Sequence, residues 1–345
     1  MIDIKNLTLD ELKAELKGAG EPAYRAEQIF DWLYKKGALR FEDMTNLGHA
    51  LREKLKRMFA LGRLELQGVF RSKDRAVKYL FRLQDGRGIE TVLIPAGGRA
   101  TVCLSTQVGC KFGCAFCASG LNGFTRNLTP SEIVGQVLFL RNRLDVALTN
   151  IVFMGMGEPL DNFENLAKAI LILNSADGLG IAARRMTISS VGVIPGLERF
   201  MQMDLQVNLS ISLHAAGDAK RTALMPANMK YPLEKVIAAC EAYGKDGGRK
   251  ITLEYVLLKG VNDAPADAAG LARIAKRLKA KINLIPYSPV IGLPFETPEE
   301  RRIGDFTRML EEKNVPVTLR RSKGRDIQAA CGQLAGKLLE GNPLR

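Results

Sequence analysis

The chain has 345 residues, of which 46% are hydrophobic and 25% are charged. This composition is enough for one large domain with a smaller attachment, or for two domains, and it argues against a disordered protein. No apolar run approaches the roughly 20 residues of a membrane span, and the first residues lack the pattern of an export signal. The six cysteines are therefore expected in a reducing cytoplasm, where thiol or metal chemistry is more common than stabilising disulfides.

The net charge of +13 comes from 50 Lys and Arg residues against 37 Asp and Glu residues. A polyanion is the natural partner of such a chain, although a merely basic, well-solvated surface would give the same balance. Because no membrane helix is predicted, nucleic acid is favoured over lipid. The basic residues that cluster in the sequence are Arg184, Arg185, Arg320, Arg321, Lys323 and Arg325.

The first 96 residues are predicted to form a small accessory domain of helices and a β-hairpin. Thr8 and Glu11 have the spacing of a capping box, and residues 23–37 and 49–59 carry apolar side chains at helical spacing. Residues 64–95 instead alternate with a period of two and are broken by Asp85 and Gly86, a hairpin turn signal.

Residues 97–345 repeat a strand-then-helix pattern. The strand candidates are nearly continuous apolar runs, which is typical of a parallel sheet covered by helices. About six such units indicate an α/β fold with a curved, partial barrel, because eight units would need more chain. Residues 285–298 are rich in proline and are predicted to form a long loop. The predicted strands lie at 100–107, 149–155, 185–190, 206–214, 250–258, 281–287 and 315–320, and predicted helices at 130–144, 162–174, 232–244, 267–280 and 298–314.

Polar motifs follow the first four of these strands. Cys110 comes after the first strand, Gly157 and Glu158 after the second, Ser189 ends the third and His214 follows the fourth. Functional residues of such barrels sit at the C-terminal ends of the strands. The agreement between motif and architecture supports both.

The most informative motif is C-x3-C-x2-C, formed by Cys110, Cys114 and Cys117. Three thiolates on one loop can hold three corners of a cubic iron–sulfur cluster and leave one iron open to a small molecule, because complete protein ligation takes four cysteines. A structural zinc site would need a fourth ligand, and three unrelated buried thiols are the other alternative. Glycines throughout the loop favour the cluster, since they let the backbone wrap closely. The candidate fourth ligands are all distant: His49, His214, Cys103, Cys240 and Cys331.

This motif at the end of the first strand resembles that of the radical S-adenosylmethionine (SAM) superfamily. The segments MGMGEPLDNFENL, ISLHA, NLIP, DIQAACGQLAG and PAYRAEQIFDWLYKKG make the chain closely similar to the RlmN family, which methylates C2 of adenosine in ribosomal and transfer RNA. The resemblance covers essentially the whole chain. The sister Cfr family methylates C8, confers antibiotic resistance and shares most of these motifs; Pro159 in the segment EPLDNF favours the RlmN family.

The resemblance implies a radical SAM barrel with a [4Fe–4S] cluster on Cys110, Cys114 and Cys117, and two SAM molecules per turnover. Adenine C2 is not a nucleophile, so the cofactor must supply a radical route. One electron, from a donor such as flavodoxin or ferredoxin, would cleave SAM to a 5′-deoxyadenosyl radical. The residues implied to bind SAM are Gly157, Glu158, Ser189, Ser212, Leu213, His214 and Asn283, although each alone would more often be an ordinary structural residue.

Three further residues take chemical roles by resemblance. Cys331 accepts a methyl group from the first SAM as a thiolate nucleophile, and its S-methylene radical then adds to C2 of adenine. Glu90 accepts the C2 proton. Cys103 attacks the Cys331 sulfur and leaves a transient disulfide that must be reduced. Read without the resemblance, Cys103 would be an inert buried thiol and Glu90 a surface residue, and Cys240 matches no motif.

The implied partners are 23S ribosomal RNA and transfer RNA, and a monomer is expected. A folded RNA must unstack the target adenine before it can reach the barrel. The accessory domain and the basic clusters are predicted to grip backbone phosphate and shape rather than sequence. A basic, metal-stabilised RNA-binding protein without catalysis remains an alternative from another class.

Overall fold

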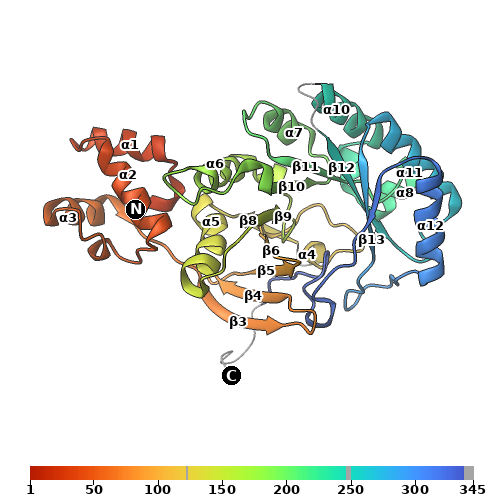
Figure 1. Ribbon diagram of the computed structural model, residues 1–345, viewed down its shortest axis with the longest axis horizontal. Helices are drawn as coiled ribbons and strands as arrows, with labels where there is room; N and C mark the ends of the chain where they lie inside the picture. The colour runs from red at the N-terminus through yellow and green to blue at the C-terminus, as the bar shows by residue number, and fades with distance from the viewer. Residues whose placement is uncertain (122, 246–249, 338–345) are drawn as a thin grey trace.

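The N-terminal part of the protein is helical and lies to one side of the barrel (Figure 1). The computed structural model describes residues 1–121, 123–245 and 250–337. The first helices are α1 (Leu9–Gly18), α2 (Tyr24–Phe30, continued by a π-helical turn over Asp31–Lys35) and α3 (His49–Met58), with short strands β1 (Ile2–Asp3) and β2 (Phe59–Ala60) paired in parallel. The capping box is confirmed, because Thr8 Oγ1 accepts from Glu11 N at 3.3 Å and Glu11 Oε2 accepts from Thr8 N at 2.9 Å.

A ten-stranded mixed sheet dominates the rest of the described chain. Seven of its strands are parallel and run in sequence order from the middle of the sheet to one edge, which confirms the predicted α/β barrel architecture. Each lies within or one residue beyond a predicted strand. They are β6 (Arg99–Cys103), β9 (Asn150–Phe153), β10 (Met186–Ser190), β11 (Asn208–Ser212), β12 (Ile251–Leu257), β13 (Lys281–Pro286) and β14 (Val317–Leu319).

Helices cover the outer side of the curved sheet in Figure 1. All five predicted helices of this part are present, and the proline-rich loop between β13 and the last helix is confirmed as well. The helices are α4 (Ala118–Leu121), α5 (Pro130–Leu138, continued by a π-helical turn over Phe139–Arg143), α6 (Phe163–Asn174), α7 (Ile194–Met201), α8 (Asp218–Leu224), α9 (Ala227–Lys230), α10 (Leu233–Lys245), α11 (Pro265–Arg277) and α12 (Glu300–Glu312).

Three antiparallel strands extend the same sheet beyond β6. They are β3 (Glu65–Arg71), β4 (Val77–Arg82) and β5 (Gly88–Ala96), and the predicted turn at Asp85 and Gly86 joins β4 to β5. β5 pairs with β6 through five residue pairs from Val92↔Cys103 to Ala96↔Arg99. The domain division expected after residue 96 therefore has paired strands on either side, and it remains a proposal. A separate small sheet joins β7 (Gln107–Gly109) to β8 (Phe124–Asn127).

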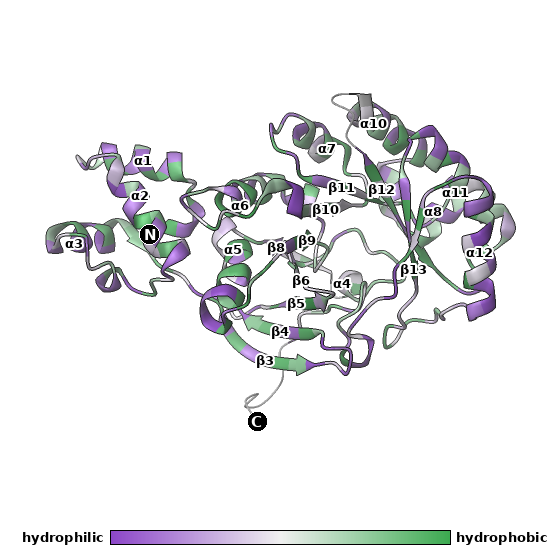
Figure 2. Ribbon diagram, viewed as in Figure 1, coloured by the Kyte–Doolittle hydropathy of each residue, from purple (hydrophilic) through white to green (hydrophobic). Residues whose placement is uncertain are grey.

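The core lies between the strands and the helices around them. Figure 2 shows hydrophobic residues concentrated on the strands, with hydrophilic residues on the outer parts of the helices. Strand residues such as Ile151, Phe153, Ile188 and Leu253 are fully buried, as the predicted apolar runs require. Among the described helices, none combines the length and the apolar character needed to cross a bilayer.

Candidate active site

The C-terminal ends of the parallel strands surround a cavity of about 150 Å³. It gathers Cys331 and residues at or after the ends of the first four predicted strands, although these are separated by up to 221 positions along the chain. The predicted residues that line it are Cys110, Cys114, Cys117, Gly157, Glu158, Ser189, Ser212, His214 and Cys331. Parallel strands bring such residues together because their carboxyl ends share one edge of the sheet.

The three motif cysteines lie on a closed loop between β7 and α4. Cys110 N donates to Gly123 O at 3.0 Å, and Cys117 N donates to Cys114 O at 3.1 Å. Gly109 has a φ of +74°, and a Cβ there would collide with Gly123 O, so only glycine fits. The backbone thus turns back on itself and directs the three thiols toward one cavity.

The surroundings of these thiols fit an iron–sulfur cluster better than a single ion. Burial raises the pKa of Cys110 to about 12, and it raises the pKa of Cys114 well above its usual value, with the neighbouring thiols adding to both shifts. Ionised thiols in such buried surroundings need a cationic group to stabilise them. No three His, Cys, Asp or Glu side chains in the described part of the chain are placed to hold one metal ion. A zinc site needs its donors about 2.3 Å from one ion, whereas each cysteine of a cluster binds a different iron.

Gly157 and Glu158 form the part of the cavity that follows β9. Gly157 has a φ of +95°, and a Cβ would overlap the side chain of Gln107. The carboxylate of Glu158 is buried and accepts from Val191 N at 2.9 Å and from Leu160 N at 3.0 Å. Burial raises the pKa of Glu158 to about 7. A ligand ammonium group would favour the charged form of this carboxyl.

Polar side chains on β10, on β11 and just after β11 line the cavity next to Glu158. Ser189 Oγ and Ser212 Oγ lie 3.3 Å apart. The imidazole of His214 accepts from Val256 N through Nδ1 at 3.0 Å and packs edge-on against Phe116. Burial lowers the pKa of His214 to about 3, so the ring is neutral and presents hydrogen-bonding rather than charge.

Leu213 and Asn283 lie next to residues that line the cavity but do not line it themselves. Neither is among the residues that line the cavity. Leu213 is buried, and its backbone N donates to Glu254 O at 3.0 Å. Asn283 Nδ2 donates to Glu254 Oε2 at 2.7 Å, so it holds a residue that does line the cavity.

Cys103 and Cys331 line a second cavity of about 200 Å³, next to the first. Arg320 and Met154 line both cavities, together with Cys331. Burial and the nearby Cys331 raise the pKa of Cys103 to about 12, while Arg320 opposes this shift. Cys331 in turn is the largest cause that raises the pKa of Arg320. The guanidinium of Arg320 thus lines the same cavity as both sulfurs. All six cysteines are free thiols in this structure.

Glu90 lies inside the protein, contrary to the surface position that its sequence context alone suggested. Its side chain is buried, with a relative exposure of 5%. Glu90 Oε1 pairs with Lys78 Nζ at 2.8 Å, and Oε2 accepts from Ala335 N at 2.7 Å and from Gly336 N at 3.1 Å. Glu90 therefore contacts the segment that carries Cys331.

That segment also rests on the cysteine loop. Ala118 N donates to Gly332 O at 2.7 Å, and Ser119 Oγ donates to Leu334 O at 2.7 Å. Ala118 follows Cys117 directly, so the backbone on one side of Cys331 is tied to the backbone next to the proposed cluster ligands.

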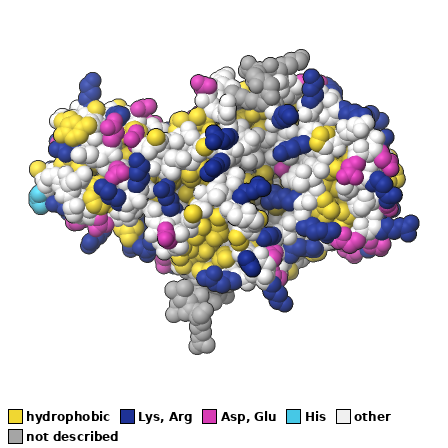
Figure 3. Space-filling view, in the orientation of Figure 1, with side chains coloured by type: hydrophobic (Ala, Val, Ile, Leu, Met, Phe, Trp, Pro, Cys, Tyr) yellow, Lys and Arg dark blue, Asp and Glu magenta, His cyan; other side chains and the backbone are white. Residues whose placement is uncertain are grey.

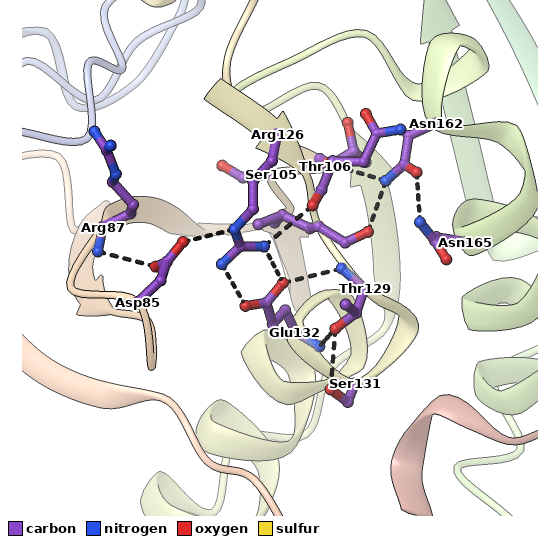
Figure 4. A network of polar contacts seen from close by, with 12 residues as sticks. Asp85, Arg87, Ser105, Thr106, Arg126, Thr129, Ser131, Glu132, Asn162 and Asn165 are labelled. Carbon is purple, nitrogen blue, oxygen red and sulfur yellow. Dashed lines mark hydrogen bonds and ion pairs between the residues drawn. The ribbon is translucent and has the colours of Figure 1, made fainter. Parts of the chain in front are cut away.

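A polar network fixes the strand that returns from the cysteine loop (Figure 4). Arg126, on β8, donates to both oxygens of Glu132 at 2.8 Å and to Asp85 Oδ2 at 2.7 Å. Asn162 Nδ2 donates to Thr106 O at 2.8 Å in the same region. The network links β8, the β4–β5 turn and the start of α5, so the base of the loop is held from three sides.

Sequence reasoning missed the positions of three charged residues here, of which Glu254 and Arg221 are buried and Arg320 is partly exposed. Glu254 lines the cavity in the middle of β12, Arg320 was assigned only to the surface, and Arg221 is fully buried with Nη2 donating to Val191 O at 2.6 Å. The available signal was a charged residue within an apolar strand, which Glu254 provides. Arg221 and Arg320 lie in polar sequence and carried no such signal.

Comparisons with known proteins agree with this architecture. Residues 104–272 match the model of the radical SAM superfamily, and residues 2–61 match that of the ribosomal RNA large subunit methyltransferase N-terminal domain. A crystal structure of a radical SAM methyltransferase from Sphaerobacter thermophilus superimposes with a TM-score of 0.93. It is 43% identical and covers 98% of this chain and 100% of its own. The fold and the site thus define a radical SAM methyltransferase.

Curated relatives narrow the assignment from this class to one family. The dual-specificity RNA methyltransferase RlmN of Geobacter sulfurreducens is 47% identical over 338 residues, covering 98% of this chain and 93% of the relative. The protein of that name from Geotalea uraniireducens is 45% identical over 337 residues, covering 98% and 97%. The chain belongs to the RlmN family of dual-specificity RNA methyltransferases.

Proposed function

We propose that the protein methylates C2 of an adenosine in 23S ribosomal RNA and in transfer RNA, with Cys331 as the methyl carrier. One observation carries the proposal: Cys331 lines the cavity of the three loop cysteines and also the cavity of Cys103. A sulfur in that position can receive a methyl group on one side and meet a second thiol on the other. Family membership supports RNA as the substrate.

Cys110, Cys114 and Cys117 would hold the [4Fe–4S] cluster, and Gly157, Glu158, Ser189, Ser212 and His214 would bind SAM beside it. When bound, the cluster and two SAM molecules per turnover supply the methyl group and a 5′-deoxyadenosyl radical. Leu213 and Asn283 would contribute by positioning, since Asn283 donates to Glu254. The neutral ring of His214 and the paired serines offer hydrogen bonds to a polar ligand without adding charge.

Cys331 would attack the SAM methyl as a thiolate, and Arg320 lines the same cavity. After one hydrogen atom leaves its S-methyl group, the Cys331 methylene radical would bond to adenine C2, the adduct would give up one electron, and Glu90 would take the C2 proton. Cys103 Sγ would then bond to Cys331 Sγ as the bond between Cys331 Sγ and the methylene carbon breaks, and a proton added to that carbon would complete the methyl group and free the RNA. The resulting disulfide is transient and must be reduced before the next cycle.

The RNA backbone is proposed to approach along a basic groove of about 480 Å³ beside these two thiols. The groove shares Ala96 and Lys323 with the Cys103–Cys331 cavity. Lys and Arg side chains are spread over the middle of the face in Figure 3. Phosphates bound along the groove would bring an unstacked adenine to Cys331. The charged residues that line the groove are Lys73, Asp74, Arg75, Arg99 and Lys323.

The six basic residues expected to bind RNA differ in their surroundings. Arg320 lines the cavity of the two thiols. Arg321 forms a two-pronged ion pair with Glu300, at 2.7 and 2.6 Å, while Arg184 and Arg185 are exposed. Lys323 lines the groove, and Arg325 is exposed next to it in sequence. Lys323 is therefore the strongest candidate among them for a phosphate contact close to the reaction.

A one-electron donor such as flavodoxin or ferredoxin would reduce the cluster. The protein is proposed to act as a monomer in the cytoplasm, where a reducing environment would keep its six thiols free.

The position of the new methyl group tests this function. Protein reconstituted anaerobically with iron and sulfide is incubated with SAM, a reductant and unmodified 23S RNA, and the digested nucleosides are analysed by mass spectrometry against synthetic standards. We expect 2-methyladenosine. Finding 8-methyladenosine alone would assign the chain the chemistry of the Cfr family. Protein that binds RNA but contains no iron and methylates nothing would favour a non-catalytic RNA-binding protein.

A further inference from the structure

The segment from Gln328 to Gly336 carries Cys331 and crosses the antiparallel part of the sheet. In Figure 1 this C-terminal segment runs beside β4 and β5. Lys78 lies on β4 and Glu90 on β5. In the register of the two strands Lys78 pairs with Val92 and Leu80 with Glu90, so Lys78 and Glu90 are diagonal neighbours on one face.

Both ends of the segment are bound by this one pair of side chains. Lys78 Nζ donates to Gln328 O at 3.1 Å, three residues before Cys331. Glu90 Oε2 accepts from Ala335 N at 2.7 Å and from Gly336 N at 3.1 Å. The ion pair between Lys78 Nζ and Glu90 Oε1, at 2.8 Å, links the two side chains that bind the ends of the segment.

We propose that Lys78 and Glu90 form a charge-dependent clamp that positions the Cys331 segment, with Lys78 as a positioning residue not otherwise involved in the reaction. The functional part of this inference rests on the methyl-carrier role proposed for Cys331. The clamp holds the sulfur between the cysteine loop and Cys103. Without it, the segment would keep its contacts to Ala118, Ser119 and Pro289 and those within the loop.

Burial makes the clamp depend on charge. Lys78 and Glu90 are 7% and 5% exposed, so each ion needs the other to offset its lost hydration. Hydrogen bonds to an ionised acceptor are also stronger than those to a neutral one. Proton uptake by Glu90 would weaken its bonds to Lys78, Ala335 and Gly336 together. The residue proposed to take the C2 proton could thus hold the segment before the reaction and loosen it afterwards, when Cys103 must reach Cys331.

A purely structural role would look different. The pair would then stabilise the sheet as a whole, and its removal would lower overall stability without selecting the C-terminal segment. Buried ion pairs are weak contributors to net stability, whereas three of the four bonds described here end on backbone atoms of one nine-residue segment.

Amide hydrogen exchange tests the clamp without any substrate. The full-length, cluster-reconstituted protein is compared with Lys78→Met, Glu90→Gln and the Lys78→Met/Glu90→Gln double variant, in peptides covering residues 325–337. We expect exchange of the Ala335 and Gly336 amides to accelerate by about tenfold or more in all three, with other peptides near wild-type rates. Lys78→Arg, which keeps the charge, should restore most of the protection. The matched control is Lys220→Met, which breaks the Lys220–Asp267 ion pair (2.6 Å) elsewhere.

The same variants link the clamp to function. In a single turnover with labelled SAM and no RNA, methyl occupancy of Cys331 in Lys78→Met should form several-fold more slowly than in wild type, and Lys78→Arg should recover. Wild-type exchange in Lys78→Met and in the double variant would overturn the clamp. Faster exchange with unchanged Cys331 methylation would overturn its positioning role. A protected segment in a wild-type protein that methylates no RNA would instead refute the proposed function and leave the clamp intact. The double variant, which buries no unpaired charge, serves if Lys78→Met does not fold.

Discussion

The buried carboxylates Glu158 and Glu90, one in the parallel and one in the antiparallel half of the sheet, have different partners. Glu158, after parallel strand β9, is held by two backbone amides, those of Leu160 and Val191, without a lysine or arginine partner in the described contacts. Glu90, on antiparallel strand β5, is paired with Lys78. The first carboxylate is left to attract a cation from outside, and the second is already neutralised. The parallel half is therefore suited to hold charged cofactors, and the antiparallel half to hold the segment with Cys331.

The largest effect is expected from the cysteine loop of the parallel half. Cys114→Ala should lower cluster content and reduce RNA methylation to background, because one iron loses its only protein ligand. Iron and sulfide analysis of anaerobically prepared protein, together with a methylation assay, checks this. Cys240→Ala is the matched control, since Cys240 is buried on α10 away from both cavities. Equal iron content in Cys114→Ala and Cys240→Ala would contradict the division of roles between the halves.

The next effect concerns Cys103, at the boundary between the halves, where β6 pairs with both β5 and β9. Cys103→Ala should limit the reaction to less than one equivalent of released product and accumulate a covalent protein–RNA adduct, because no thiol remains to attack Cys331. Denaturing gel electrophoresis with labelled RNA detects the adduct. The Cys103→Ala/Cys331→Ala double variant should form none. Wild-type release of methylated RNA from Cys103→Ala would exclude the resolving role.

A smaller effect is expected on stability, and it sharpens the contrast between the two carboxylates. The pKa of Glu158 is raised by burial to about 7, from an unfolded value near 4.5, so the native state favours its protonated form. Its stability contribution is complete below about pH 4.5 and is lost as the pH rises through 7. Over that range the cluster-free protein should lose up to about 3 kcal/mol from this group.

Urea unfolding of cluster-free protein at pH 5 and pH 8, under reducing conditions, measures this loss. Glu158→Gln should flatten the change between the two pH values, because its side chain does not ionise. An identical pH dependence in Glu158→Gln and wild type would mean that the buried carboxyl does not titrate as its surroundings require.

The smallest effect is expected from the basic groove at the rim of the antiparallel half. Arg99→Ala should weaken RNA binding a few-fold and reduce the slope of log K against log salt concentration by about 1, as the loss of one phosphate contact does. Filter binding at several salt concentrations provides the slope. Lys313→Ala, at the exposed end of α12, is the control. Equal slopes for Arg99→Ala and Lys313→Ala would place the RNA path elsewhere.

The parallel half was predictable from the sequence because its strands are continuous apolar runs, and their ends locate Cys110, Glu158 and Ser189 without knowledge of the fold. The antiparallel half was predictable only locally. Alternation and the Asp85–Gly86 turn predicted a hairpin, but the pattern does not say that β5 would pair with β6. The contact between Lys78 and the carbonyl of Gln328 joins residues 250 positions apart. No local pattern encodes such a contact, and so the surroundings of Glu90 emerged only from the structure.

The most direct test of the central claim follows one methyl group through Cys331. Protein is first methylated on Cys331 with isotopically labelled SAM, freed of excess cofactor, and then given RNA, a reductant and unlabelled SAM for a single turnover. The account predicts that the label leaves the Cys331 peptide and appears in the modified adenosine. Unlabelled methyl in the RNA, with the label still on Cys331, would show that this sulfur does not carry the transferred group.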